Sequence, residues 1–286
     1  MAAETGRIVV GVDPSAHAAA AVSWAAREAA DRGMPLHLIN ALGLPPGDRG
    51  MPLPGSYAEA GRTASGLLLR HLASVVADQY PQLAVTSEVS ETGAAESLVA
   101  LGGEDDLLVT GTRGHGGFAG LLLGSVSLKT AVHAHCPAVV VRGHEKTAPS
   151  LELVLGVEGG ESEAPIRFAF ESCERLGARL LVVRAWLSAP SYAGYYLTSA
   201  PATDAEQFDD VEKLVGPVRA AHPLVEVETR VIRGNAVPAL IDAARGSRLL
   251  IVGAHRRRAP LSVGAGYVVQ GLLSHAETPI AVVPIA

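Results

Sequence analysis

The sequence predicts an α/β fold in which two tandem, doubly wound domains each carry a five-stranded parallel sheet. In each half, apolar runs of strand length alternate with helical patterns, as expected when helices cover both faces of a parallel sheet. The same signals also recur along the chain: residues 7–13 (RIVVGVD) match 152–158 (ELVLGVE), and 107–111 (LLVTG) match 249–253 (LLIVG). This repeat predicts two homologous domains, residues 1–146 and 150–286.

The individual elements follow from the same patterns. In the first half we expect strands near residues 7–12, 35–42, 84–90, 106–110 and 138–142, with a long helix near 58–79. Glycine and proline mark residues 43–55 as a loop. In the second half, a helix from 166 to a glycine at 177 precedes a strand at 180–186, and 279–283 forms the last strand. Trp24 and Phe168 occupy matching helix positions and are predicted to be core residues.

Composition and charge narrow the classes of partner. The net charge is −6 and the pI is near 5.9, so no overall field favours nucleic acid or an anionic membrane. The apolar runs are too short to span a bilayer, and the N-terminus has no secretory signal pattern. Two cysteines, Cys136 and Cys173, form no metal-ligand spacing and are expected to be buried small hydrophobic residues. We therefore expect a cytoplasmic protein without a nucleic-acid or membrane partner.

A glycine-rich loop after the fourth strand carries the most specific chemistry. Its residues are 109–117 (VTGTRGHGG), and a helix is expected to begin near 124–127 (GSVS). Glycines let backbone N–H groups approach phosphate oxygens, and a helix start adds unpaired N–H donors and the positive end of its dipole. The candidate phosphate-binding residues are Gly111, Thr112, Arg113, Gly114, His115, Gly116, Gly124, Ser125, Val126 and Ser127. Loop chemistry alone equally allows a turn that only needs glycines, and neither the P-loop nor the dinucleotide fingerprint is present.

The spacing of this loop resembles the ATP-binding signature of the universal stress protein family. The match consists of Gly111 and Gly114, nine intervening residues, and then Gly124-Ser125. Residues 9–15 (VVGVDPS) and 133–139 (HAHCPAV) also resemble that family, and the resemblance covers both halves. It implies a Rossmann-like sheet that binds ATP between the ends of the first and fourth strands. It also implies a pseudo-dimer of the two domains through strands 138–142 and 279–283, with a further homodimer possible; the protein partner stays unknown.

The resemblance assigns further residues to the nucleotide. Gly11, Val12 and Asp13 lie at the end of the first strand, where Asp13 would contact the nucleoside side and support Mg²⁺ through water. The alternative for Asp13 is a helix N-cap, which suits Asp-Pro-Ser. Ala41, at the end of the second strand, would meet adenine through its backbone. Arg113 and His115 could face phosphate or solvent.

The second half departs from the signature at three places. Arg256 stands where Gly114 stands, Gly266-Tyr267 replaces Gly124-Ser125, and Glu158 replaces Asp13. These changes predict weakened or lost ATP binding in the second domain. The basic run 255–258 (HRRR) could still hold a phosphate through its side chains, or it could be a solvated loop.

The expected function is an ATP-binding stress-response or signalling module, whose first domain holds the nucleotide. Phosphoryl transfer needs a positioned water and a charge-stabilising cation, and the motif contains no obvious water-positioning residue. No catalytic residue and no protein metal site is therefore assigned; His133 and His135 have no third ligand. The alternatives are a slow ATPase or nucleotidyl-transferring enzyme, and an interaction scaffold without nucleotide.

Overall fold

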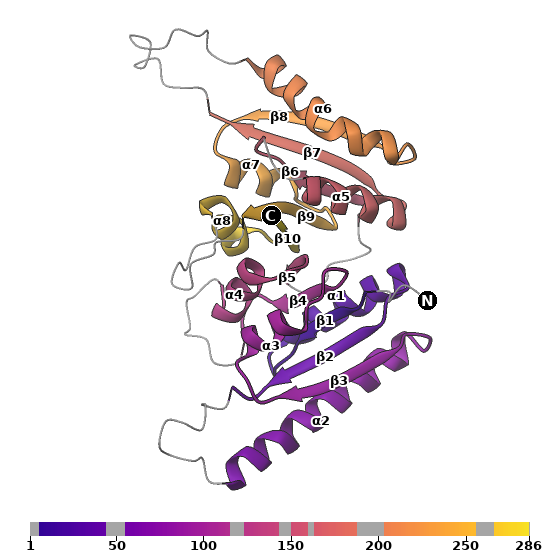
Figure 1. Ribbon diagram of the computed structural model, residues 1–286, viewed down its shortest axis with the longest axis vertical. Helices are drawn as coiled ribbons and strands as arrows, with labels where there is room; N and C mark the ends of the chain where they lie inside the picture. The colour runs from indigo at the N-terminus through magenta and orange to yellow at the C-terminus, as the bar shows by residue number, and fades with distance from the viewer. Residues whose placement is uncertain are drawn as a thin grey trace. The chain divides into compact units, whose positions relative to one another are not determined.

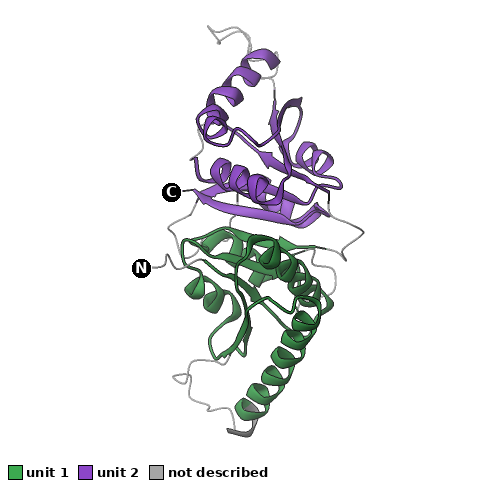
Figure 2. Ribbon diagram, turned by 90° about the vertical axis from the view of Figure 1, so that its right-hand side faces the viewer, with its two compact units in different colours: residues 1–146, 256–265 green, residues 147–255, 266–286 purple. Residues whose placement is uncertain are grey.

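The computed structural model describes residues 6–43, 55–114, 123–142, 150–159, 163–187, 203–255 and 266–285. Contacts between Cα atoms divide these residues into two compact units (Figure 2). The described residues up to Arg142 belong to unit 1, and those from Ser150 onwards belong to unit 2. Each unit is an α/β fold, in agreement with the repeat in the sequence.

The sheet of unit 1 is parallel throughout, with the strand order β3-β2-β1-β4-β5 (Figure 1). Its strands are β1 (Ile8–Gly11), β2 (Leu36–Ala41), β3 (Val85–Ser90), β4 (Leu107–Gly111) and β5 (Ala138–Val141). The central strands are apolar and buried on both faces, which is why each appears in the sequence as a continuous apolar run. The strand order reverses between β1 and β4, and open α/β sheets bind their ligands at such a point.

Four helices cover the sheet of unit 1: α1 (Ala16–Arg32), α2 (Gly55–Gln79), α3 (Ala94–Leu101) and α4 (Ser125–His133). Helix α1 packs beside α2 and α3 packs beside α4, one pair on each face of the sheet. Helix α1 begins at a capping serine, Ser15, whose Oγ accepts a hydrogen bond from the Ala18 N–H at 3.1 Å. It ends at Gly33, whose φ of 65° suits a residue without a Cβ.

Unit 2 repeats this topology, with the strand order β10-β9-β6-β7-β8. Its strands are β6 (Glu152–Gly156), β7 (Arg179–Trp186), β8 (Val227–Arg233), β9 (Leu249–His255) and β10 (Ile280–Ile285). Its helices are α5 (Glu163–Leu176), α6 (Asp204–Ala221), α7 (Ala236–Ala243) and α8 (Tyr267–His275). Helix α6 begins with a capping box in which Thr203 and Glu206 satisfy each other's backbone N–H groups.

The prediction for the two helix aromatics is half correct. Trp24 is buried, with 2% of its surface exposed, but Phe168 is only partly buried. Phe170 fills the core instead and is 0% exposed. The reason is the apolar stripe of α5, which runs through Ile166, Ala169, Phe170 and Cys173 at helical spacing and leaves residue 168 beside it.

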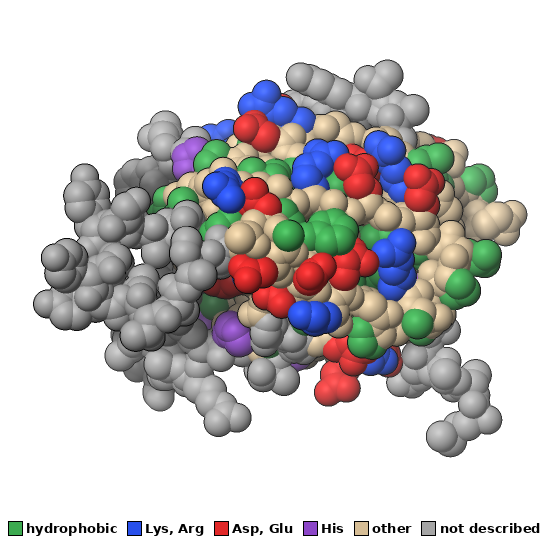
Figure 3. Space-filling view, turned by 90° about the horizontal axis from the view of Figure 1, so that it is seen from above, with side chains coloured by type: hydrophobic (Ala, Val, Ile, Leu, Met, Phe, Trp, Pro, Cys, Tyr) green, Lys and Arg blue, Asp and Glu red, His purple; other side chains and the backbone are tan. Residues whose placement is uncertain are grey.

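One face of the molecule, drawn in Figure 3, shows mixed charge. On the face in Figure 3, acidic and basic side chains alternate, and its described part carries no continuous basic patch. Among the described helices, none has the length and apolar character needed to cross a membrane.

Both cysteines are buried free thiols, as predicted, with 1% of their surface exposed. Burial raises the pKa of Cys136 to about 12 and that of Cys173 to about 12. The thiolate is the reactive form, so both thiols are expected to resist a chromogenic disulfide reagent at neutral pH in the native protein. Both should react once the chain is unfolded in denaturant. Rapid reaction of either thiol in the folded protein would contradict this expectation.

Candidate functional site

A cleft of about 180 Å³ lies at the carboxyl ends of β1, β2 and β4 in unit 1. Several predicted site residues line it: Gly11, Val12, Asp13, Ala41, Gly111, Arg113, Gly114, Val126 and Ser127. Thr112, Gly124 and Ser125 are their chain neighbours, whereas His115 and Gly116 lie outside the described residues. The structure thus brings together strand ends and the glycine-rich loop, which are about a hundred residues apart in sequence.

Asp13 lies against the glycine-rich loop. A Cβ built on Gly114 would be only 2.6 Å from Asp13 Oδ2, so the carboxylate lies beside the Gly114 backbone. Asp13 Oδ1 accepts a hydrogen bond from the Ser15 N–H at 3.0 Å, and Ser15, not Asp13, caps α1. Asp13 is therefore not the helix N-cap, the alternative that the sequence allowed. Its carboxylate lines the cleft, where it can meet a ligand.

The start of α4 folds back onto the end of β4. The Gly124 N–H donates to the Thr112 carbonyl at 2.6 Å, and the Ser127 hydroxyl donates to the Gly111 carbonyl at 2.6 Å. Because its hydroxyl hydrogen is used in this way, Ser127 holds the loop in place and would meet a phosphate through its backbone. The N-cap is Gly124, which makes no side-chain capping bond, so neither Ser125 nor Ser127 caps the helix. An uncapped helix start of this kind presents backbone donors to an anion.

Sequence reasoning missed a buried polar pair on the wall of the cleft. Asn40 Nδ2 donates to the Val12 carbonyl at 2.6 Å, and Ser65 Oγ donates to Asn40 Oδ1 at 2.5 Å. Both residues are buried, and Asn40 lines the cleft. The pair fixes the backbone immediately before Asp13. An asparagine within the apolar strand LHLINA was the signal that could have pointed to it.

A larger hollow of about 510 Å³ lies between α3 and the end of α4. Glu96, Lys129, His133 and His135 line it together with alanine, valine and glycine residues. It contains none of the glycine-rich loop residues, and no group of three potential metal ligands occurs among the described residues. Size alone would favour this hollow, but the chemistry of the smaller cleft is more specific.

Comparison with known proteins identifies the family of the chain. A model of the universal stress protein family matches residues 4–142 and again 152–284. The chain belongs to the universal stress protein family. A universal stress protein of Mycolicibacterium smegmatis is 30% identical over 287 residues, covering 96% of each chain. One from Mycobacterium tuberculosis is 28% identical over 288 residues, again covering 96% of each.

Solved structures show the same fold. A universal stress protein from Archaeoglobus fulgidus superposes with a TM-score of 0.73 at 12% identity, covering 99% of this chain and 97% of that chain. A protein from Pseudomonas aeruginosa, described as functionally unknown, reaches 0.61 at 14% identity, covering 99% and 93% of the two chains. The two units are therefore two universal stress protein domains, the first and the second domain.

The second domain differs at the equivalent edge of its sheet. Glu158 is exposed after β6, and Tyr267, the first residue of α8, is 75% exposed. Arg256, the substitution for Gly114, lies outside the described residues, as do positions 257 and 258 of the basic run. Weakened or lost ATP binding in the second domain therefore stays a prediction from the sequence.

Proposed function

We propose that this universal stress protein binds ATP in the cleft of its first domain and acts as a stress-response or signalling module. The observation that carries the proposal is the contact between Asp13 and Gly114 at the point where the strand order reverses. The carboxylate would hold the nucleoside side of the ligand, and could support Mg²⁺ through water. The phosphates would meet the loop after β4 and the start of α4.

The cleft supports binding more directly than catalysis. Among its described lining residues, Asp13 is the one acid and Arg113 the one base. Phosphoryl transfer needs a residue that positions water as well as charge stabilisation. With Asp13 assigned to the nucleoside, no second acid in the described lining takes that role. The bound nucleotide would then shift a conformation or a partner surface.

The ligand itself can be identified directly. Mass spectrometry of small molecules released from the denatured purified protein should find an adenine nucleotide, and isothermal titration calorimetry should show heat on adding ATP. If neither experiment detects a nucleotide, the proposal fails and an interaction scaffold becomes the better description.

The variant Gly114→Arg tests the site. Any side chain at this position must displace the Asp13 carboxylate, because its Cβ would lie 2.6 Å from Oδ2. We expect ATP affinity to fall by about tenfold or more, a change of roughly 1.4 kcal/mol. Gly266→Arg is the matched control, since a Cβ there meets nothing within 4 Å. Unchanged affinity in Gly114→Arg would contradict the proposed site.

An enzyme would behave differently. Multiple-turnover release of ADP, abolished in Asp13→Ala with an unchanged thermal melt, would favour a slow ATPase.

Formation of the pseudo-dimer, a further homodimer and a cytoplasmic location remain parts of the proposal. The free thiols at Cys136 and Cys173 agree with a reducing compartment. Sedimentation analysis measures the oligomeric state.

A further inference from the structure

The two domains place different hydrogen-bonded pairs at the same position of the fold. Ile39 pairs with Gly11 in the first domain, and Val183 pairs with Gly156 in the second. The next residues are Asn40 and Arg184, which are therefore equivalent. Their partners are equivalent too, because Ser65 and Gln207 each lie 20 residues before the first residue of the following strand, β3 or β8.

In the first domain the pair is short and directed back into the fold. The Asn40 amide lies between the Val12 carbonyl and the Ser65 hydroxyl, so both ends of the side chain are held. With Asn40 and Ser65 8% and 7% exposed, the pair forms part of a wall. The cleft of about 180 Å³ remains open beside it.

In the second domain the pair is long and extends across the strand ends. Arg184 Nε donates to Gln207 Oε1 at 2.6 Å. The rest of the guanidinium lies against Gly159: a Cβ built there would be 2.6 Å from Arg184 Nη1 and 3.3 Å from Cζ. Gly159, with a φ of 118°, follows Glu158, the residue that replaces Asp13. The guanidinium thus lies over the strand end where the first domain exposes its cleft.

We propose that this pair decides which domain admits a nucleoside: Arg184 with Gln207 closes the cleft of the second domain, and Asn40 with Ser65 keeps that of the first domain open. The inference rests on the proposed ATP site. It gives a role to four residues outside the glycine-rich signature. Closure of the second cleft by Arg184 and Gln207 is also a separate cause of lost binding from the substitutions at Arg256 and Tyr267. A nucleoside entering the second domain would have to displace a cation that is already hydrogen bonded and packed.

Exchanging the pairs tests the inference. We expect Asn40→Arg/Ser65→Gln to lower the affinity of the first domain for both ATP and adenosine by about tenfold or more, measured by isothermal titration calorimetry. Adenosine is included because a closed nucleoside cleft should exclude it. The loss of a phosphate contact alone would leave adenosine binding unchanged. The matched control Arg184→Asn/Gln207→Ser changes only the second domain and should leave ATP affinity of the first domain unchanged.

Folding is checked by thermal melting. Asn40→Arg alone lacks the acceptor that Gln207 provides in the second domain, so the double variant should melt higher than the single one. If the double variant does not fold, the reverse exchange Arg184→Asn/Gln207→Ser tests the inference instead. It is made in a chain that also carries Gly114→Arg, which weakens the site of the first domain. This combined variant should gain adenosine binding. A folded reverse variant without this gain would overturn the inference.

The outcomes separate the two proposals. If the unaltered protein binds neither ATP nor adenosine, the proposed function fails. If it binds both and the folded Asn40→Arg/Ser65→Gln variant binds them equally well, the proposed function stands and the inference is wrong.

Discussion

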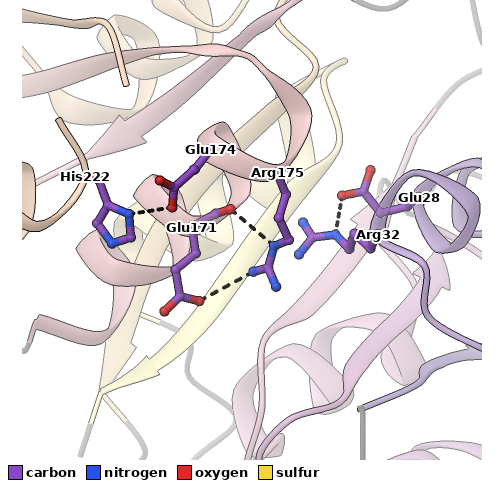
Figure 4. Close-up of polar contacts among 6 residues, drawn as sticks. All are labelled: Glu28, Arg32, Glu171, Glu174, Arg175 and His222. Atoms are coloured by element: carbon purple, nitrogen blue, oxygen red, sulfur yellow. Dashed lines mark hydrogen bonds and ion pairs between the residues drawn. The ribbon is translucent and has the colours of Figure 1, made fainter. Parts of the chain in front are cut away.

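Replacing Glu28 with alanine in α1 is expected to lower the free energy of unfolding of the first domain by about 3–5 kcal/mol, the cost of breaking a buried ion pair. Glu28 Oε1 lies 2.6 Å from Arg32 Nε, one helical turn away, and the two side chains are 1% and 3% exposed (Figure 4). Removing the carboxylate takes away the negative charge beside a buried guanidinium. The second pair with this spacing in Figure 4, Glu171–Arg175, is 43% exposed at both ends and should contribute far less.

Urea unfolding followed by fluorescence measures this effect. The chain has two tryptophans, and Trp24 lies in α1 itself, so a Trp186→Phe background reports the first domain alone. Glu91→Ala is the control in the same domain, because its pair with Arg62 is 2.8 Å long but 61% and 49% exposed. Its removal should cost less than about 1 kcal/mol. A similar loss in Glu28→Ala and Glu91→Ala would contradict the role of burial.

The second domain suggests how the loss could be reversed. Counting back from Gly33 and Gly177, which follow α1 and α5, Glu28 and Arg32 correspond to Ser172 and Leu176. A buried pair can often be exchanged for residues that need no charge partner. Glu28→Ser/Arg32→Leu should therefore be more stable than Glu28→Ala. A double variant as unstable as the single one would show that the pair holds α1 through further contacts.

Some features of the fold and of the site depend on a local pattern or on the type of one residue, and these could be predicted from the sequence. A buried parallel strand needs a continuous apolar run, so the central strands of both domains were predicted close to their observed positions. Strand β8, which has no such run, was not predicted. Gly114 is informative because only glycine leaves room for the Asp13 carboxylate. The repeat allows two copies of the same fold to be compared, and it shows at which candidate site residues the copies differ.

Other features depend on how side chains pair in space and were not visible in the pattern. Asn40 and Ser65 lie 25 residues apart, and their hydrogen bond depends on the placement of α2 over β2. The burial of Glu28 is equally hidden, since a glutamate on a helix usually faces solvent. Phe168 was misplaced for a geometric reason: two residues along a helix, at Phe170, the side chain points to nearly the opposite face.

The variant Gly111→Ala should combine a loss of stability with a loss of ATP binding. A Cβ at Gly111 would lie 2.5 Å from the His17 carbonyl oxygen and 2.7 Å from its carbon, both backbone atoms of α1. Relief therefore requires α1 or β4 to move, and overpacking of this kind costs about 1–3 kcal/mol or more. The Gly111 carbonyl also accepts the Ser127 hydroxyl, so the same movement disturbs the start of α4, where the phosphates are proposed to bind.

A glycine in the same domain separates this steric effect from a general cost of adding a methyl group. At Gly66 in α2, an added Cβ would be 3.4 Å from Arg70 Nη1, the end of a flexible side chain. Gly66→Ala should therefore raise the stability by about 0.5–1 kcal/mol, as alanine does within a helix, with ATP affinity unchanged. Urea unfolding reported by Trp24, and calorimetry with ATP, compare the two variants. If Gly111→Ala matched the unaltered protein in both stability and ATP affinity, then α1 could move to accommodate a side chain at the end of β4. A glycine at this position would then not be needed for the close approach that shapes the cleft.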